Sequence, residues 1–432
     1  MILRPRVKSE PTRVSIARGL EDRETGTLDT RRSTSQSQSL YCRGTGSDLH
    51  LGYCTNVHPG ETWAQTFDAL ERWTLEVKRR LGRSGSYGIG LRLSDRASRE
   101  LSERTALLEF QRWLERHDCY VFTINGFPFG QFHAGAVKER VYLPDWTQPE
   151  RVDYTVRLFE LLSKLVPASV EGSVSTLPGG LKEFTSGREP EAAIRANLWR
   201  CVEQIARVSE QAGRTLHLGL EPEPCCLLEN SVEAAAFFDR LREEHPGDPR
   251  LDEHLGVTYD TCHFAVEFEA PADALARLRE HGIRISKIQL SNALSFSPKP
   301  ALLDQLAGFA ENIYLHQVIL RREDGSLERF KDLDLALAKQ LSQAAGAEEW
   351  RVHFHVPLNS EPAAGFGTTA SHITGVLEEV RKEPRLCAHL EIETYTWAVL
   401  PEPLKTHDVC EQITGEYQWV LERLAERGWV TG

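Results

Sequence analysis

Leu-Gly-Val-Thr-Tyr-Asp-Thr-Cys-His-Phe-Ala-Val-Glu-Phe-Glu, residues 255–269, is the stretch that decides the fold. It begins as a short β-prone run that ends on a carboxylate, Asp260, and His263 follows three residues later. In a βα unit this order places Asp260 at the carboxyl end of a strand and His263 in the loop beyond it. Parallel α/β barrels build their active sites on that face, and Mn, Zn, Co or Fe accepts a carboxylate beside an imidazole. An Asp after a strand is also a common helix N-cap, so the pair alone does not establish a site.

Outward from this stretch, β-prone segments alternate with longer segments of helical period from Leu49 onward. The expected strands are 49–55, 87–93, 119–125, 169–176, 215–221, 255–260, 284–291, 351–356 and 388–394. This alternation predicts a parallel sheet with helical crossovers. The number of units, and the lack of a Gly-rich phosphate fingerprint after the first strand, favour a TIM (β/α)8 barrel over an open dinucleotide-binding sheet.

Nine strand candidates exceed the eight that a barrel needs, so one late strand is an accessory element. The sequence leaves open which one it is. Two further β-prone runs, 314–320 and 326–330, flank Glu323-Asp324-Gly325. The Asp-Gly turn between them predicts an extra β-hairpin.

The first 48 residues differ from the rest of the chain. They are rich in Arg, Ser and Thr and show no sustained period. Such a composition predicts a disordered N-terminal extension over residues 1–48, before a barrel domain over residues 49–432. No apolar core follows the arginines, as a secretory signal requires, and several acidic residues disfavour a transit peptide.

Composition restricts the partners of this 432-residue chain. Its formal net charge of −12 at pH 7 disfavours a nucleic-acid partner. No apolar run approaches the roughly 20 residues of a membrane span. The nine cysteines are odd in number and lack zinc-finger spacing. They therefore predict reduced thiols in a cytoplasmic protein.

Acids and histidines gather at the ends of the later strands. In chain order they are Glu221, Glu223, Asp260, His353, His355 and Glu393. A neutral residue, Gln289, stands at the end of the strand between Asp260 and His353. A charged residue in a barrel mouth costs several kcal/mol unless it is paired or bound to a metal. Their repeated placement therefore predicts a metal or catalytic site. The alternative is an ion-pair network with Arg92 and Lys287, and His353 is equally well explained as a core histidine.

The earlier strands contribute neutral groups and one cation. Asn56 and His58 follow the first strand, Arg92 lies in the second, and Asn125 ends the third. Such groups suit a polyhydroxylated or anionic ligand, whereas turn chemistry is the alternative for the two asparagines. Aromatic residues that include Trp397 suit the wall of a pocket. The loop over residues 126–146 is long enough to predict a lid.

Several of these motifs resemble one known family. The segments are 53–63 (Tyr-Cys-Thr-Asn-Val-His-Pro-Gly-Glu-Thr-Trp), 123–128 (Thr-Ile-Asn-Gly-Phe-Pro), 220–224 (Leu-Glu-Pro-Glu-Pro), 259–264 (Tyr-Asp-Thr-Cys-His-Phe) and 391–397 (Glu-Ile-Glu-Thr-Tyr-Thr-Trp). Together they are similar to the metabolite traffic protein EboE family, within the xylose-isomerase-like superfamily. The resemblance covers roughly residues 49–424.

The resemblance implies a TIM barrel encoded in a bacterial gene cluster that makes or moves a secondary metabolite. Proteins of the same cluster are then expected partners. It also implies a divalent metal ion, Mn, Zn, Mg or Co, held by Glu221, Asp260, a histidine and Glu393. This chain has Gln289 where the superfamily supplies the histidine from strand seven. His355 would then take over, with His263 and His316 as alternatives, and Glu223 is the alternative to Glu221.

These observations together predict a metal-dependent, isomerase- or epimerase-like enzyme that acts on a small polyhydroxylated or carbonyl metabolite. Glu221 and Glu393 are the expected proton-transfer groups. The expected substrate contacts are Asn56, His58, Arg92, Asn125, Glu223, His263, Gln289 and Trp397. The rival hypothesis, motivated by Gln289, is a non-catalytic metabolite-binding or trafficking protein on the same barrel. DNA repair on the pattern of AP endonucleases is opposed by the acidic balance.

Overall fold

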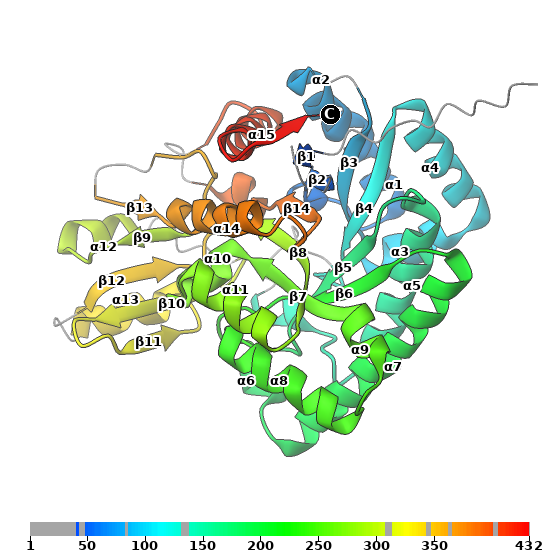
Figure 1. The fold of residues 1–432 in the computed structure, drawn as a ribbon. Coiled ribbons are helices and arrows are strands. Elements are labelled where there is room, and N and C mark those ends of the chain that lie inside the picture. The colour runs from blue at the N-terminus through cyan, green and yellow to red at the C-terminus, as the bar shows by residue number, and fades with distance from the viewer. Residues whose placement is uncertain are drawn as a thin grey trace, which may run out of the picture. The chain divides into compact units, whose positions relative to one another are not determined.

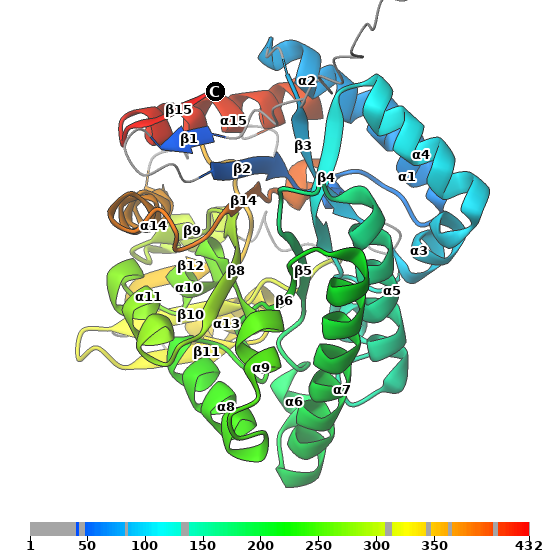
Figure 2. The same cartoon turned by 45° about the vertical axis from the view of Figure 1, so that its right-hand side comes forward.

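Eight parallel strands follow one another around a ring (Figure 2). The computed structural model describes residues 40–42, 48–82, 85–130, 138–306, 313–342, 347–361, 365–400 and 405–431. The ring consists of β2 Asp48–Tyr53, β14 His389–Ile392, β8 Arg284–Leu290, β7 Leu255–Asp260, β6 Leu216–Leu220, β5 Gly172–Thr176, β4 Cys119–Asn125 and β3 Tyr87–Arg92, paired in this order. A parallel bridge from Cys54 to Gly90 brings the two ends of the sheet together. The predicted TIM barrel is confirmed.

Helices follow the barrel strands and cover the outside of the ring (Figure 1). The capping signals in the sequence explain several of their starts. Asn230 accepts hydrogen bonds from two backbone N–H groups of the helix that it caps, and Pro271 opens the second helix after β7. The helices are α1 Trp63–Ala69, α2 Leu75–Leu81, α3 Asp95–Ser102, α4 Arg104–Arg116, α5 Pro149–Leu165, α6 Lys182–Thr185, α7 Arg188–Ala212, α8 Ser231–Glu244, α9 Pro249–His254, α10 Thr261–Val266, α11 Pro271–Glu280, α14 Ala370–Lys382 and α15 Val409–Ala425.

Two short strands extend the sheet beyond the barrel. Strand β1, Leu40–Cys42, pairs antiparallel with β2 and with β15, Trp429–Thr431. The predicted N-terminal extension, residues 1–48, otherwise falls on residues 1–39 and 43–47, which lie outside the described residues. Strand β2 begins at Asp48, at the predicted start of the barrel.

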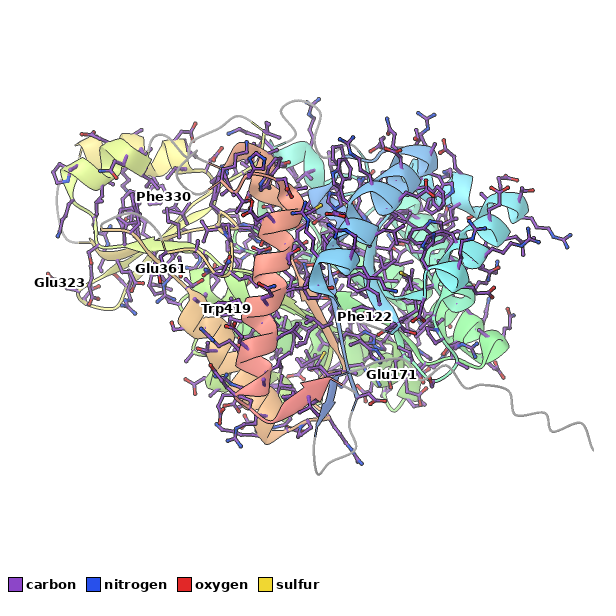
Figure 3. The ribbon with its side chains drawn as sticks, turned by 90° about the horizontal axis from the view of Figure 1, so that it is seen from above. Phe122, Glu171, Glu323, Phe330, Glu361 and Trp419 are labelled. Atoms are coloured by element: carbon purple, nitrogen blue, oxygen red, sulfur yellow. The ribbon has the colours of Figure 1, made fainter. Side chains whose placement is uncertain are left out.

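An insertion over residues 294–368, between β8 and α14, forms a second, antiparallel sheet. Its strands are β11 Leu327–Phe330, β10 Val318–Arg322, β12 Ala347–Val352, β9 Leu294–Phe296 and β13 Gly367–Thr368, in this order across the sheet, with helices α12 Pro300–Leu306 and α13 Leu333–Ser342 beside it. The predicted hairpin is β10–β11. Figure 3 shows Glu323 and Phe330 of this hairpin well apart from Phe122 of barrel strand β4.

The surplus late strand is the run predicted over residues 351–356. It forms β12 of the insertion, because its backbone pairs antiparallel with β9 and β10 and with no barrel strand. The strand ends at Val352, so His353 and His355 lie in the segment that follows it. The expectation that these histidines stand at a barrel strand end is thereby corrected.

The barrel interior is filled by large or charged side chains opposite glycines. A Cβ atom at Gly52 would lie 2.9 Å from the ring of Phe122, and one at Gly90 would lie 1.9 Å from Oε1 of Glu391. Lys287 and Glu391 form an ion pair inside the barrel, and both side chains are fully buried. No helix in the described part of the chain has the length and apolar character needed to cross a membrane.

One buried carboxyl group, Glu416 on α15, ties this helix to the segments around the barrel mouth. Its Oε1 accepts hydrogen bonds from Thr394 Oγ1, at 2.8 Å, and from the backbone N–H of Leu358, at 3.1 Å. Burial raises the pKa of Glu416 from 4.5 to about 8. The native state therefore keeps a proton that the unfolded chain loses, and stability falls as pH rises from about 4.5 to about 8.

We expect Glu416→Gln to remove most of this pH dependence, because the amide cannot ionise. The variant should be the more stable protein near pH 8, by an amount on the order of a few kcal/mol, when urea unfolding is followed across the range. Glu422→Gln, on an exposed position of the same helix, should behave like the parent protein. Parallel pH profiles for the Glu416 variant and the parent would contradict the assignment.

Candidate metal centre

A cavity of about 50 Å³ lies among the residues at the carboxyl ends of the barrel strands, the face where α/β barrels carry their active sites. Acids and histidines, Glu221, Glu223, His263, His353, His355 and Glu393, line one part of it. Both described ends of the predicted lid loop contribute to the wall, and residues 131–137 lie outside the described residues. The other lining residues are Asn56, Phe127, Pro128, Lys138, Val141, Tyr142, Tyr314, Leu315 and Tyr395.

Three carboxylates from three strand ends converge beside this cavity. One oxygen each of Glu221, Asp260 and Glu393 lies within 4.8 Å of the others, and all three side chains are buried. In the described part of the chain no Lys or Arg nitrogen lies within 4.0 Å of them. Burial and the neighbouring acids raise the pKa of Glu221 well above its usual range and that of Glu393 to about 8. Such an acidic cluster favours a cation or a shared proton.

Glu393 is held by three amide groups. Asn56 Nδ2 donates to its Oε1 at 2.8 Å and Asn125 Nδ2 donates to the same oxygen at 3.1 Å, while Gln289 Nε2 donates to Oε2. The orientation of Asn125 is fixed because its Oδ1 accepts from the backbone N–H of Phe127. These three residues were predicted to contact substrate, and the structure places them around Glu393.

The two carboxylate oxygens of Asp260 have different surroundings. Oδ1 caps α10 by accepting from the N–H groups of Cys262 and His263, at 2.7 and 3.0 Å, and it accepts from Ser291 Oγ. Oδ2 is buried and has no hydrogen-bond partner in the described structure. Burial opposes the charge of Asp260, but the adjacent histidines and the hydrogen bonds from Ser291 and from the backbone N–H of His263 together outweigh it and lower its pKa. The N-cap role and a ligand role are therefore compatible.

Three imidazoles meet on the other side of Asp260. His263 Nε2 lies 3.2 Å from His353 Nε2, which lies 3.2 Å from His355 Nε2. We call His263, His353 and His355 the histidine cage. Burial lowers the pKa of His355 to about 4 and that of His353 well below its usual range, so both are neutral at pH 7. His263 comes from the first turn of α10, whereas the other two come from the insertion.

Oxygen acceptors fix the outward nitrogen of each cage histidine. The Nδ1 atoms of His263 and His355 face the backbone carbonyls of Pro222 and Glu393, at 3.0 and 2.9 Å. The Nδ1 atom of His353 lies 2.7 Å from Gln317 Oε1. These contacts orient ligands as metal sites commonly do.

Gln317 belongs to a buried network that sequence reasoning missed. Its Nε2 faces the carbonyl oxygen of Pro224, which only accepts, as well as Glu223 Oε1 and Tyr142 Oη. Tyr142 in turn donates to Glu223 at 2.5 Å. The sequence signal is weak, since a Tyr in the predicted lid and a Gln within the β-prone run 314–320 carry no motif.

Three predicted substrate contacts lie elsewhere in the fold. His58 bonds to Tyr53 Oη and stacks on Trp73. The Arg92 guanidinium donates to the backbone carbonyls of Gly60, Pro128 and Gly130, so it braces loops. Trp397 donates to Thr406 Oγ1 and packs between the barrel and insertion cores. By contrast, Glu223 and His263 do line the cavity.

The donors beside the cavity fit a divalent cation. Neutral imidazole nitrogens, an unpartnered buried carboxylate oxygen and two further acids form a mixed N/O set that suits Zn, Mn, Fe or Co. A second cavity, of about 610 Å³, opens at the opposite end of the barrel and is lined by Glu171, His217, Arg284 and His389 among others. None of the predicted site residues lines it.

No protein-family model matches the chain, and no curated protein matches it. Solved structures with xylose-isomerase-like barrels do. An L-ribulose 3-epimerase is 11% identical (TM-score 0.49; 88% of this chain, 95% of that chain). A xylose isomerase-like TIM barrel protein from Mycobacterium smegmatis in complex with magnesium is 13% identical (0.48; 88% and 97%). The IOLI protein with a bound zinc atom is 12% identical (0.44; 88% and 99%). At these scores the likeness carries no argument about activity.

Proposed function

We propose that this protein is a metal-dependent enzyme that isomerises or epimerises a small polyhydroxylated or carbonyl metabolite. The observation that carries the proposal is the convergence of Glu221, Asp260 and Glu393, unpaired with any described Lys or Arg, beside three histidines and a cavity. Its setting, in line with the resemblance to the EboE family, is a bacterial cytoplasmic pathway that makes or moves a secondary metabolite.

Glu221 and Glu393 are the groups that would move a proton. The pKa of Glu393, about 8 because of burial and nearby acids, lets this carboxyl group donate or accept a proton near neutral pH. Asn56, Asn125 and Gln289 hold it in one orientation. A bound divalent cation supplies polarisation of a substrate oxygen. Tyr142 and Tyr395 form aromatic parts of the cavity wall beside these polar groups.

The proposal is tested by exchange of substrate hydrogen with solvent. Purified protein loaded with Mn, Co or Zn is incubated in D₂O with a panel of ketoses, aldoses and cyclic polyols, and NMR follows deuterium at carbon. We expect metal-dependent incorporation with at least one compound. Glu393→Gln should slow it by about 10²–10⁴-fold, whereas Glu109→Gln, exposed on α4, should leave it unchanged. A lack of exchange with every loaded form and compound would refute the proposed chemistry.

A second candidate, a metabolite-binding or trafficking protein without turnover, is favoured by Gln289. The superfamily resemblance expects a histidine ligand there, but this amide donates to Glu393 instead. The two candidates differ in one outcome, because a carrier binds a compound from the same panel and releases it unaltered. Saturable binding by calorimetry, with no deuterium incorporation, would select the carrier.

A further inference from the structure

We propose that the cation of this protein sits in the histidine cage, with Asp260 as its carboxylate ligand, and not among Glu221, Asp260 and Glu393. The inference deepens the proposed metal dependence but does not rest on turnover. It replaces the ligands Glu221 and Glu393, expected from the superfamily resemblance, with His263 and His353. It keeps Asp260 and His355.

The hydrogen-bond partners of the cage determine where its protons lie. Pro222 O and Glu393 O are carbonyl oxygens that only accept, so the facing Nδ1 atoms of His263 and His355 carry hydrogens. Gln317 turns its NH₂ toward Pro224 O, so its Oε1 faces His353 and assigns a hydrogen to that Nδ1 as well.

A cage imidazole whose one hydrogen lies on the outward Nδ1 turns a bare Nε2 lone pair inward. Two successive Nε2–Nε2 separations are only 3.2 Å, and without a hydrogen these atoms repel one another. Tetrahedral zinc with nitrogen ligands at about 2.0–2.1 Å holds neighbouring nitrogens about 3.4 Å apart. Each of these two neighbouring pairs of cage nitrogens thus has about the spacing of two ligands on one ion.

Asp260 is suited to complete the cage. One of its oxygens lies within 4.8 Å of ligand nitrogens of His263 and His355, and its Oδ2 is buried without a partner. Cys262 is the rival fourth ligand, since its Sγ lies within 4.8 Å of nitrogens of His353 and His355. The thiol also packs in an apolar cluster with Val266, Ala293 and Ile319, which favours Asp260.

The carboxylate group is less available to a cation. Glu393 already accepts three hydrogen bonds from amide nitrogens, two at Oε1 and one at Oε2. One of these donors is the side-chain amide of Gln289 on β8, whose Nε2 donates to Glu393 Oε2. A cation there would compete with these donors for the oxygens of Glu393. With the cation in the cage, Glu221 and Glu393 stay free to move protons.

The experiment measures zinc binding by variants of the full-length chain. Metal-free protein is titrated with Zn²⁺ alone by calorimetry, and its Co²⁺ form is examined by visible absorption. We expect one zinc per chain in the parent protein. Loss of an outer partner of a ligand costs about 10–100-fold in metal affinity, so His353→Gln and His263→Gln should each cost at least about 100-fold. Glu393→Gln, an isosteric change outside the cage, should cost less than about tenfold.

Circular dichroism and urea unfolding establish that each variant is folded, and the two histidine variants act as independent tests. A tetrahedral Co²⁺ spectrum without a thiolate charge-transfer band supports Asp260 over Cys262, and a thiolate band overturns that assignment. Two zinc ions per chain, no zinc, or loss of zinc on Glu393→Gln but not on His353→Gln overturns the cage site. Zinc bound in the cage without any turnover would refute the proposed enzyme and leave this inference standing.

Discussion

Lys287→Met is expected to lower the free energy of unfolding by about 3–5 kcal/mol, the cost of leaving one partner of a buried ion pair alone. Lys287 Nζ lies 2.5 Å from Glu391 Oε2 and 2.9 Å from Ser175 Oγ, and neither charged side chain is exposed. Burial acts against the charge of Lys287, but Glu391 and other acids outweigh it and raise its pKa. The lysine is therefore charged at pH 7. Its removal leaves the carboxylate of Glu391 buried in the barrel without its partner.

Two comparisons give this prediction its control. Lys287→Met combined with Glu391→Leu removes both charges, so urea unfolding should recover most of the lost stability. Lys382→Met breaks an exposed pair with Glu379 on α14 and should cost no more than about 1 kcal/mol. If the single and double variants are equally unstable, packing and not charge explains the loss.

The strands show why the positions of β-strands along the sequence could be predicted, whereas the partners with which they pair could not. Strands 119–125 and 255–260 were predicted with the bounds that the structure has, because β-prone runs flanked by helical periods are local signals. The run at 351–356 carries the same signal, yet it pairs with β9 and β10 of the insertion. Strand pairing is a tertiary choice that composition does not record.

The candidate site was predictable where residue type sufficed. Glu221, Asp260, His355 and Glu393 lie together because the carboxyl ends of parallel strands meet at one edge and the insertion folds over it. Arg92 has the charge of an anion ligand, but its partners are backbone carbonyls that have no sequence signature. The protonation of the cage is set in the same way, by carbonyl oxygens and by Gln317.

Zinc is expected to stabilise the folded protein by about 4 kcal/mol when its free concentration is about 1,000 times its dissociation constant. The gain should be concentrated at one junction. His353 and His355 belong to the insertion, whereas Asp260 and His263 belong to the barrel, so one ion in the histidine cage links the two. Hydrogen exchange should therefore slow in residues 347–361 and in α10 on zinc addition, and a chelator should reverse the effect.

The distribution of this protection separates a bound ion from general tightening of the chain. His353→Gln should abolish both the gain in unfolding free energy and the slower exchange, because it removes the ligand that lies 3.2 Å from each of the other two. His281→Gln, at a partly exposed pair with Asp239, should keep both effects. Equal slowing in α4, on the far side of the barrel from the insertion in the order of the strands, would mean that zinc acts elsewhere. Protection confined to the junction requires that the insertion is held in place by the metal and not only by its apolar contacts.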